Sequence, residues 1–102
     1  MFMRISWGRL RPGRWDEYES RYQRLSTGDM PGPKPRRRWL LRDLESPDAG
    51  YTVSLWDSET DMRSYSTDPA VRARIEAEFR DLFTGEYTTR LCEVRRDHVQ
   101  DS

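Results

Sequence analysis

The stretch YTVSLWDS, residues 51–58, predicts a β-strand that runs directly into a helix. Trp56 points to one face of this strand, and the alternating apolar side chains point to the other face: Tyr51, Val53 and Leu55. Either Asp57 or Ser58 can supply the side-chain oxygen that caps the first turn of a helix. We therefore expect a short helical turn that extends from this cap to Tyr65.

The rest of the chain shows strand and helix patterns on both sides of this stretch. Alternating apolar side chains predict strands, and apolar side chains three and four residues apart predict helices. The further strands are expected at residues 2–10, 36–45 and 86–96, and the longer helices at residues 15–25 and 69–83. Between them, residues 46–50 have the composition of a hairpin connection, and residues 26–35 have that of a loop.

Local signals support both of the longer helices. Glu17 stands four residues before Arg21, which is the favourable order for an ion pair on a helix. Asp68 followed by Pro69 is a typical helix start, because the carboxylate caps the first turn and proline has no amide hydrogen to leave unpaired. The apolar face predicted for this second helix comprises Val71, Ile75, Phe79, Leu82 and Phe83, and Gly85 is expected to end it.

The predicted order of elements, βαββαβ, is that of a ferredoxin-like α+β domain. Such a domain has a four-stranded antiparallel sheet with both helices on one face. We expect one domain over residues 1–102, with a core at about residues 2–96 and a frayed tail at residues 97–102. The strands at 36–45 and 51–56 carry apolar side chains on both faces, which predicts that a second copy of the chain covers the face without helices.

The composition excludes several classes of protein. The chain has 102 residues with 18 basic and 18 acidic side chains, so its net charge of zero argues against nucleic-acid binding despite the arginine run at residues 36–38. No apolar run reaches the roughly 20 residues that span a membrane, and no signal peptide is evident, so we expect a cytoplasmic protein. The single cysteine, Cys92, is expected to be a small buried side chain, and with the single histidine it forms no zinc motif.

Three segments together resemble the antibiotic biosynthesis monooxygenase superfamily. They are the opening strand, the run RPGRWDEY at residues 11–18, and the stretch at residues 51–58 in which Trp56 ends a strand just before an acidic, serine-capped helix. The resemblance covers roughly residues 2–95. It implies a dimeric α+β barrel, in which two sheets pack face to face, and a small-molecule pocket between the sheet and the helices of each subunit.

The resemblance also implies two possible chemistries, and the chain departs from both. One is the cofactor-free oxygenation of aromatic polyketides to quinones, and the other is the oxidative degradation of haem. Both use an asparagine a few residues before the tryptophan, whereas this chain contains no asparagine. Haem-degrading members have a histidine ligand on the helix after the tryptophan, whereas the only histidine here is His98 in the tail. We therefore expect neither haem nor another cofactor.

Five residues are candidates for the site, each with a structural alternative. Trp56 matches the family tryptophan and is expected to position an aromatic substrate, or else to fill the core. Tyr65 is expected to donate a proton or hydrogen bond to a substrate or peroxide oxygen, or else to pack at a helix end. Arg90 is expected to stabilise a phenolate or superoxide charge, or else to form an ion pair. Arg38 and Trp7 are further candidates for substrate binding, with an ion pair and the core or dimer interface as their alternatives.

The resemblance, together with these residues, implies a protein that binds a small aromatic or polyketide-like molecule and acts as a cofactor-independent monooxygenase, as in antibiotic biosynthesis. The expected partners are the small molecule and a second copy of the chain, without nucleic acid or membrane. One alternative is a non-catalytic binding or assembly dimer with the same fold. Another is a polyketide cyclase or isomerase.

Overall fold

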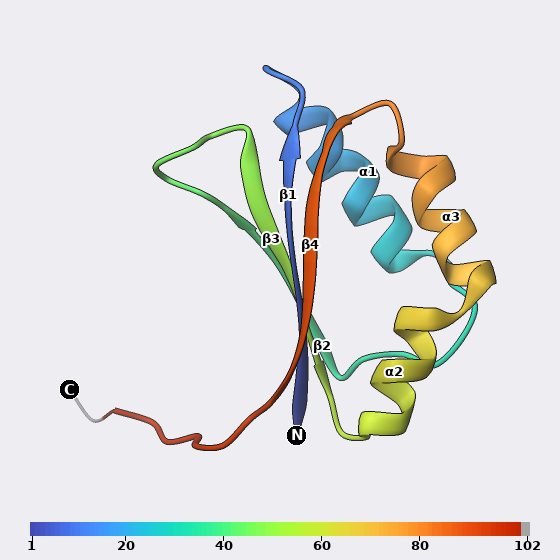
Figure 1. The fold of residues 1–102 in the computed structure, drawn as a ribbon, viewed down its shortest axis with the longest axis vertical. Coiled ribbons are helices and arrows are strands. Elements are labelled where there is room, and N and C mark those ends of the chain that lie inside the picture. The colour runs from blue at the N-terminus through green and yellow to red at the C-terminus, as the bar shows by residue number, and fades with distance from the viewer. Residues whose placement is uncertain (101–102) are drawn as a thin grey trace.

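The computed structural model describes residues 1–100, which form an antiparallel sheet with helices packed against it (Figure 1). The elements are, in order, β1 (Phe2–Leu10), α1 (Trp15–Thr27), β2 (Arg37–Arg42), β3 (Ala49–Trp56), α2 (Glu59–Thr67), α3 (Pro69–Phe79) and β4 (Phe83–Glu93). The four strands lie in the order β2-β3-β1-β4. This arrangement confirms the predicted ferredoxin-like fold, with the second helical segment divided into α2 and α3. Within residues 1–100, no helix is long and apolar enough to span a membrane.

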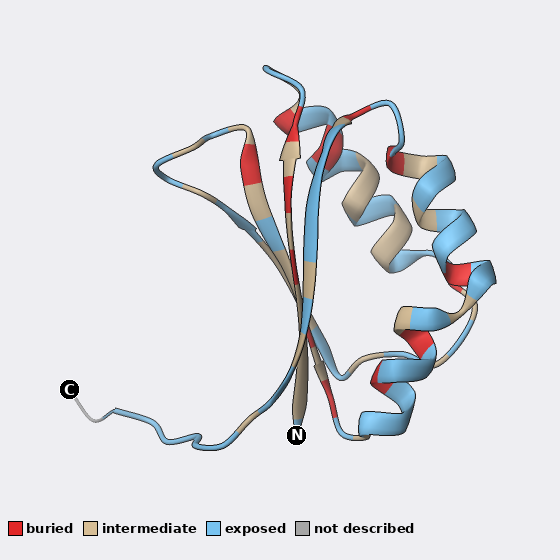
Figure 2. Cartoon of the chain, viewed as in Figure 1, coloured by how far each residue is buried: buried red, intermediate tan, exposed pale blue. Residues whose placement is uncertain are grey.

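All of these helices lie on the same face of the sheet (Figures 1 and 2). The core between the helices and the sheet consists of two clusters of buried side chains. One cluster joins α1, α3 and the ends of β1 and β4, and the other joins β3, α2 and the start of α3. Their buried members are Leu10, Trp15, Tyr18, Phe79 and Leu82 in the first cluster, and Met30, Trp56, Met62, Tyr65 and Val71 in the second.

The predicted helix starts are confirmed by the cap contacts. The Ser58 hydroxyl accepts a hydrogen bond from the Asp61 amide at 3.2 Å, and this cap begins α2. The Asp68 carboxylate accepts a hydrogen bond from the Ala70 amide at 2.8 Å, and Pro69 is the first residue of α3. The divide between α2 and α3 therefore coincides with the Asp68-Pro69 signal.

The predicted end of the second helix was wrong. The helix ends at Phe79 rather than near Gly85, and Phe83 already belongs to β4, where it pairs with Leu10. Gly85, with a φ of 104°, lies inside β4, where the register between β1 and β4 shifts. Phe83 packs edge-on against Tyr18, so its side chain contacts the apolar core although it belongs to a strand and not to the predicted helix.

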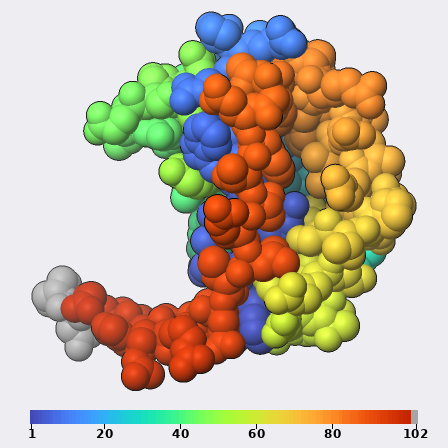
Figure 3. All heavy atoms as spheres, in the orientation of Figure 1, coloured from blue at the N-terminus to red at the C-terminus, as the bar shows by residue number. Residues whose placement is uncertain are grey.

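The face of the sheet opposite the helices, called here the open face, is apolar. Directly paired residues on β1, β2 and β3 place their side chains together on it: Met3, Ile5, Trp7, Trp39, Leu41, Tyr51, Val53 and Leu55. No element within residues 1–100 covers this face, and Leu41 is 46% exposed and Tyr51 38% exposed. The space-filling view shows this side hollowed between the β2–β3 hairpin and the segment after β4 (Figure 3).

The chain after β4 extends away from the sheet (Figure 1). The Val94 amide still bonds to the Met1 carbonyl at 2.9 Å, and residues 95–100 are exposed and without regular structure. The last two residues of the predicted tail, 101–102, lie outside the described residues.

Candidate functional site

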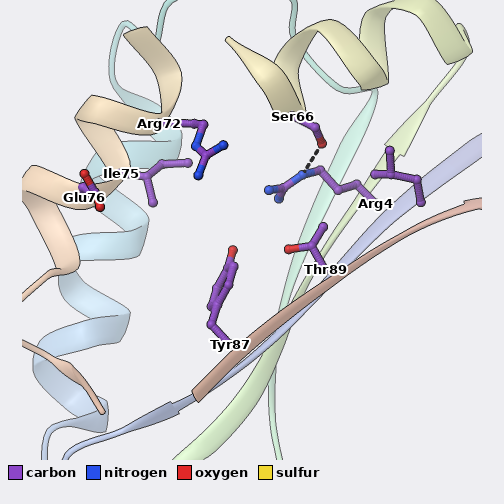
Figure 4. A pocket seen from close by; sticks show the side chains of 8 residues that line it. Arg4, Ser66, Arg72, Ile75, Glu76, Tyr87 and Thr89 are labelled. Atoms are coloured by element: carbon purple, nitrogen blue, oxygen red, sulfur yellow. Dashed lines mark hydrogen bonds between the residues drawn. The ribbon is translucent and has the colours of Figure 1, made fainter. Parts of the chain in front are cut away.

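A cavity of about 480 Å³ lies between the sheet and helices α2 and α3 (Figure 4). We call it the Arg4–Arg72 cavity. Strands β1 and β4 form one wall, and the two helices form the other. Its lining residues are Arg4, Ser66, Arg72, Ile75, Glu76, Tyr87, Thr89 and Leu91. Sites for small molecules commonly have volumes of about 300–1,000 Å³, so this cavity is large enough to hold one.

Arg4 enters the cavity from β1 because its position in the strand faces the helices. Its Nε donates a hydrogen bond to the Ser66 hydroxyl at 2.7 Å, and its guanidinium lies 5.5 Å from the centre of the Tyr65 ring. The hydroxyl group and the ring hold the guanidinium from the α2 side, as Figure 4 shows for Ser66. The terminal nitrogens of Arg4 form no ion pair within residues 1–100, and the nearby Tyr87 hydroxyl is a polar neighbour from β4, so they are available to a ligand.

Arg72 enters the cavity from α3, and its guanidinium points towards the space in front of Arg4 (Figure 4). The one acidic residue in the lining, Glu76, lies 3.8 Å from Arg80 on the same helix. No ion pair within the described chain involves Arg4 or Arg72. The cavity therefore holds two cationic groups without a carboxylate partner.

Tyr87 brings a phenol group from β4 into the same space. Its hydroxyl group points between Arg4 and Arg72, although half of the side chain is exposed (Figure 4). Burial alone would raise the pKa of Tyr87, but the hydroxyl groups of Ser6 and Thr89 and the charge of Arg4 outweigh it and lower this pKa. The Ser6 and Thr89 hydroxyl groups also bond to each other at 2.9 Å.

The structure brings three of the five predicted site residues together, next to the cavity rather than in its lining. Arg38 donates a hydrogen bond to the Tyr65 hydroxyl at 3.3 Å, and the rings of Trp56 and Tyr65 are 5.2 Å apart. The Trp56 indole N–H is bonded to the Ser54 hydroxyl at 2.9 Å. Trp56 is 1% exposed and Tyr65 is 4% exposed, so both side chains belong to the core.

The other two predicted residues, Trp7 and Arg90, lie on the open face. Arg90 pairs with Ile5, whereas its neighbours Thr89 and Leu91 face the helices and line the cavity. The alternation along β4 therefore directs Arg90 away from the cavity. Cys92 lies on the same side as Arg90 and is exposed, so the expectation that it is buried was wrong.

The sequence analysis missed Arg4, Arg72 and Tyr87. A weak signal was present for Arg4, because it shares its strand face with Ser6 and Gly8. Small side chains on a strand allow helices or ligands to approach closely. Gly8 leaves such space, since a Cβ there would lie 2.6 Å from the Phe83 ring.

The lining of the cavity offers few of the side chains that usually hold haem or a metal ion. Haem in proteins is held by an axial histidine, cysteine, methionine or tyrosine. Within residues 1–100 the lining contains no histidine, cysteine or methionine, and Tyr87 is its one residue of these types. His98 lies in the exposed segment after β4. Within the part of the chain that the structure describes, no group of three or more histidine, cysteine or acidic side chains is placed to hold a metal.

Comparison with known proteins gives a likeness of fold only. No family model matches the chain, and no curated protein matches it in sequence. Several solved structures do match it. One, from Deinococcus radiodurans and named for the antibiotic biosynthesis monooxygenases, has a TM-score of 0.77 at 14% identity and covers 100% of both chains.

Two further solved structures also match the chain. A variant of SnoaB from Streptomyces nogalater, described as a cofactor-independent oxygenase, has a TM-score of 0.71 at 19% identity over 94% of each chain. A variant of MhuD with manganese protoporphyrin IX in its active site has a TM-score of 0.73 at 20% identity over 98% of this chain and 100% of MhuD. The chain therefore has the fold of the antibiotic biosynthesis monooxygenases, as its sequence predicted.

Proposed function

We propose that the protein binds a small aromatic, polyketide-like molecule in the Arg4–Arg72 cavity and oxidises it with dioxygen, as a cofactor-independent monooxygenase. The observation that carries this proposal is the lining of the cavity. Guanidinium groups enter it from β1 and α3 and hydroxyl groups from β4, and the lining also contains the apolar Ile75 and Leu91. An aromatic molecule with an acidic hydroxyl group fits such a surface. The likeness of fold to SnoaB supports the same chemistry.

The first step is the ionisation of the substrate. A positive charge nearby favours the anionic form of a phenol or enol, and Arg4 and Arg72 supply two such charges. The resulting electron-rich anion can reduce dioxygen itself. The substrate methylene carbon loses two hydrogens and gains one oxygen atom as a carbonyl, and the second oxygen atom leaves as water.

Tyr87 is the residue best placed to handle protons in this reaction. Its hydroxyl group points into the cavity, and its lowered pKa makes it a better proton donor than an ordinary tyrosine. It can donate a proton to the peroxide oxygen that leaves as water and recover a proton from the next substrate. Tyr65 acts as a positioning residue in this proposal, because its ring lies against the Arg4 guanidinium.

A second candidate function is binding without turnover. It is favoured by the burial of Trp56 and Tyr65, because neither side chain can touch a ligand in the cavity as the structure stands. In this case the cavity selects and holds the aromatic molecule, and the same arginines supply the affinity. The two functions differ in whether dioxygen is consumed.

We also propose that a second copy of the chain covers the open face. No helix or strand within residues 1–100 covers the large apolar side chains that lie there, Trp7 and Trp39 among them, and such a patch on a small protein marks an interaction site. A face that pairs with itself fits a twofold-symmetric dimer. Light scattering should give twice the mass of one chain, and a monomer at micromolar concentration would refute this part of the proposal. A cytoplasmic location stays a prediction.

Dioxygen uptake with a panel of anthrones and catechols tests the proposed reaction. We expect uptake with at least one anthrone, together with formation of the anthraquinone, whose new carbonyl oxygen comes from dioxygen. The Arg4→Ala and Tyr87→Phe variants should lose most of the rate, roughly a hundredfold for a group that assists proton transfer. The Arg90→Ala and Arg74→Ala variants should keep it, since neither side chain lines the cavity. Binding without any uptake by the wild type would favour the second candidate.

A further inference from the structure

Several acidic side chains of this chain form ion pairs with arginines outside the Arg4–Arg72 cavity. Two examples at the surface are the ion pair between Glu17 and Arg21 and the ion pair between Glu78 and Arg24. The whole sequence has a net charge of zero, but the lining of the cavity contains more basic than acidic side chains. Two arginines and one glutamate line it, and the glutamate is close to Arg80.

The Arg4 guanidinium is held in place before any ligand arrives. Its Nε donates a hydrogen bond to the Ser66 hydroxyl at 2.7 Å, and its guanidinium lies near the Tyr65 ring. The Tyr65 hydroxyl in turn accepts a hydrogen bond from Arg38. A charged group that is fixed in advance loses little conformational entropy on binding. Its remaining N–H donors form a flat fork that matches the two oxygens of a carboxylate.

The remaining polar groups of the lining suit the same ligand. Arg72 faces Arg4 across the cavity, and the hydroxyl groups of Tyr87 and Thr89 supply further donors (Figure 4). Glu76 is the only carboxylate in this lining. The lowered pKa of Tyr87 agrees with a positive potential at its oxygen. Ile75 and Leu91 offer an apolar surface to a ring attached to the anion.

We infer that the Arg4–Arg72 cavity selects an aromatic ligand that carries an ionised carboxylate. The carboxylate lies between Arg4 and Arg72, and the ring lies against Ile75 and Leu91. This inference rests on the proposed function, because it takes the same cavity as the ligand site, and it adds the charge of the ligand. A single carboxylate has two oxygens, so it can contact both guanidinium groups, neither of which forms an ion pair within residues 1–100.

The test compares hydroxynaphthoate with the corresponding hydroxynaphthamide, which has the same ring without the charge. Quenching of the tryptophan fluorescence or calorimetry gives both dissociation constants. We expect the carboxylate to bind the wild type about tenfold to a hundredfold more tightly, as for one or two charged hydrogen bonds. Arg72→Ala should remove most of this preference. Arg74→Ala, at an exposed position two residues along the same helix, should leave it unchanged, since Arg74 does not line the cavity.

The outcomes separate this inference from the proposed function. Equal binding of acid and amide, with Arg72→Ala unaffected, overturns the carboxylate inference and leaves the oxygenase proposal standing if anthrones are oxidised. Tighter binding of the naphthyl phosphate than of the carboxylate overturns the assignment of a single negative charge. Failure of acid, amide and phosphate to bind, with no uptake of dioxygen from any anthrone or catechol, overturns both.

Discussion

Replacing Arg4 by methionine separates a ligand-binding role of this arginine from a structural one. Methionine keeps most of the aliphatic stem and removes the charge. The wild-type guanidinium makes one hydrogen bond to Ser66 and lies 5.5 Å from the Tyr65 ring centre. The Ser66 hydroxyl group is only partly buried and can bond to water instead, and the pair with the ring contributes about 0.5–1 kcal/mol at such a site. We therefore expect Arg4→Met to lower the free energy of unfolding by about 1 kcal/mol.

The loss of ligand affinity should be larger than the loss of stability. A charged hydrogen bond to a carboxylate or phenolate is worth about 1.5–3 kcal/mol, so the dissociation constant for hydroxynaphthoate should rise roughly tenfold to a hundredfold. Urea unfolding gives the stability and fluorescence titration gives the affinity.

Arg37→Met is the matched control for this experiment. Arg37 lies 4.9 Å from the centre of the Trp39 ring on the open face, so it also loses a pair with an aromatic ring but cannot touch the cavity. The affinity of the Arg37→Met variant for hydroxynaphthoate should equal that of the wild type. If Arg4→Met destabilises the fold by several kcal/mol while affinity is unchanged, Arg4 is a structural residue and the reasoning about the site is wrong.

Three further predictions concern the fold, its pH dependence and the open face. Gly50→Ala should lower the free energy of unfolding by about 2–3 kcal/mol in urea, because the new Cβ would lie 2.8 Å from the Trp15 ring and also against the Leu41 carbonyl; wild-type stability would disprove this packing. Burial raises the pKa of Tyr18, so its contribution to the free energy of unfolding is fully present below the unfolded pKa of about 10 and is lost as the pH rises above that value. In urea unfolding at a series of alkaline pH values, Tyr18→Phe should therefore lose less stability than the wild type. An equal loss in both proteins would contradict the burial of Tyr18. Val53→Arg should give a single-chain mass by light scattering with the far-UV spectrum retained, because it places a charge in the middle of the open face; a persistent dimer would locate the interface elsewhere.

Much of the fold could be predicted because its signals are local. The Asp68-Pro69 cap and the alternation before Trp56 each depend on a few neighbouring residues, and the structure confirms both. The start of β4 could not be predicted in the same way. Phe83 satisfies the helical spacing after Phe79, and only its pairing with Leu10 decides that it belongs to a strand.

The site was harder to predict because it depends on which face of each strand receives the helices. In β1 the larger apolar side chains, Ile5 and Trp7, point to the open face, while Arg4 and Ser6 point to the helices. A sequence with mixed side chains on both faces does not determine this choice. The sequence of β4 does not show which face receives the helices either. Arg90 was therefore predicted as a site residue, although Tyr87 and not Arg90 lines the cavity.

The position of the ligand is the central claim, and a side chain that fills the cavity tests it most directly. Leu91→Trp would occupy the Arg4–Arg72 cavity, whereas Ser26→Trp would occupy a second depression of about 430 Å³ beside α1, which Arg38 lines. The measurement is the dissociation constant of hydroxynaphthoate for these two variants. The account predicts that Leu91→Trp abolishes binding and that Ser26→Trp leaves it unchanged. Binding that survives in Leu91→Trp and is lost in Ser26→Trp would contradict it.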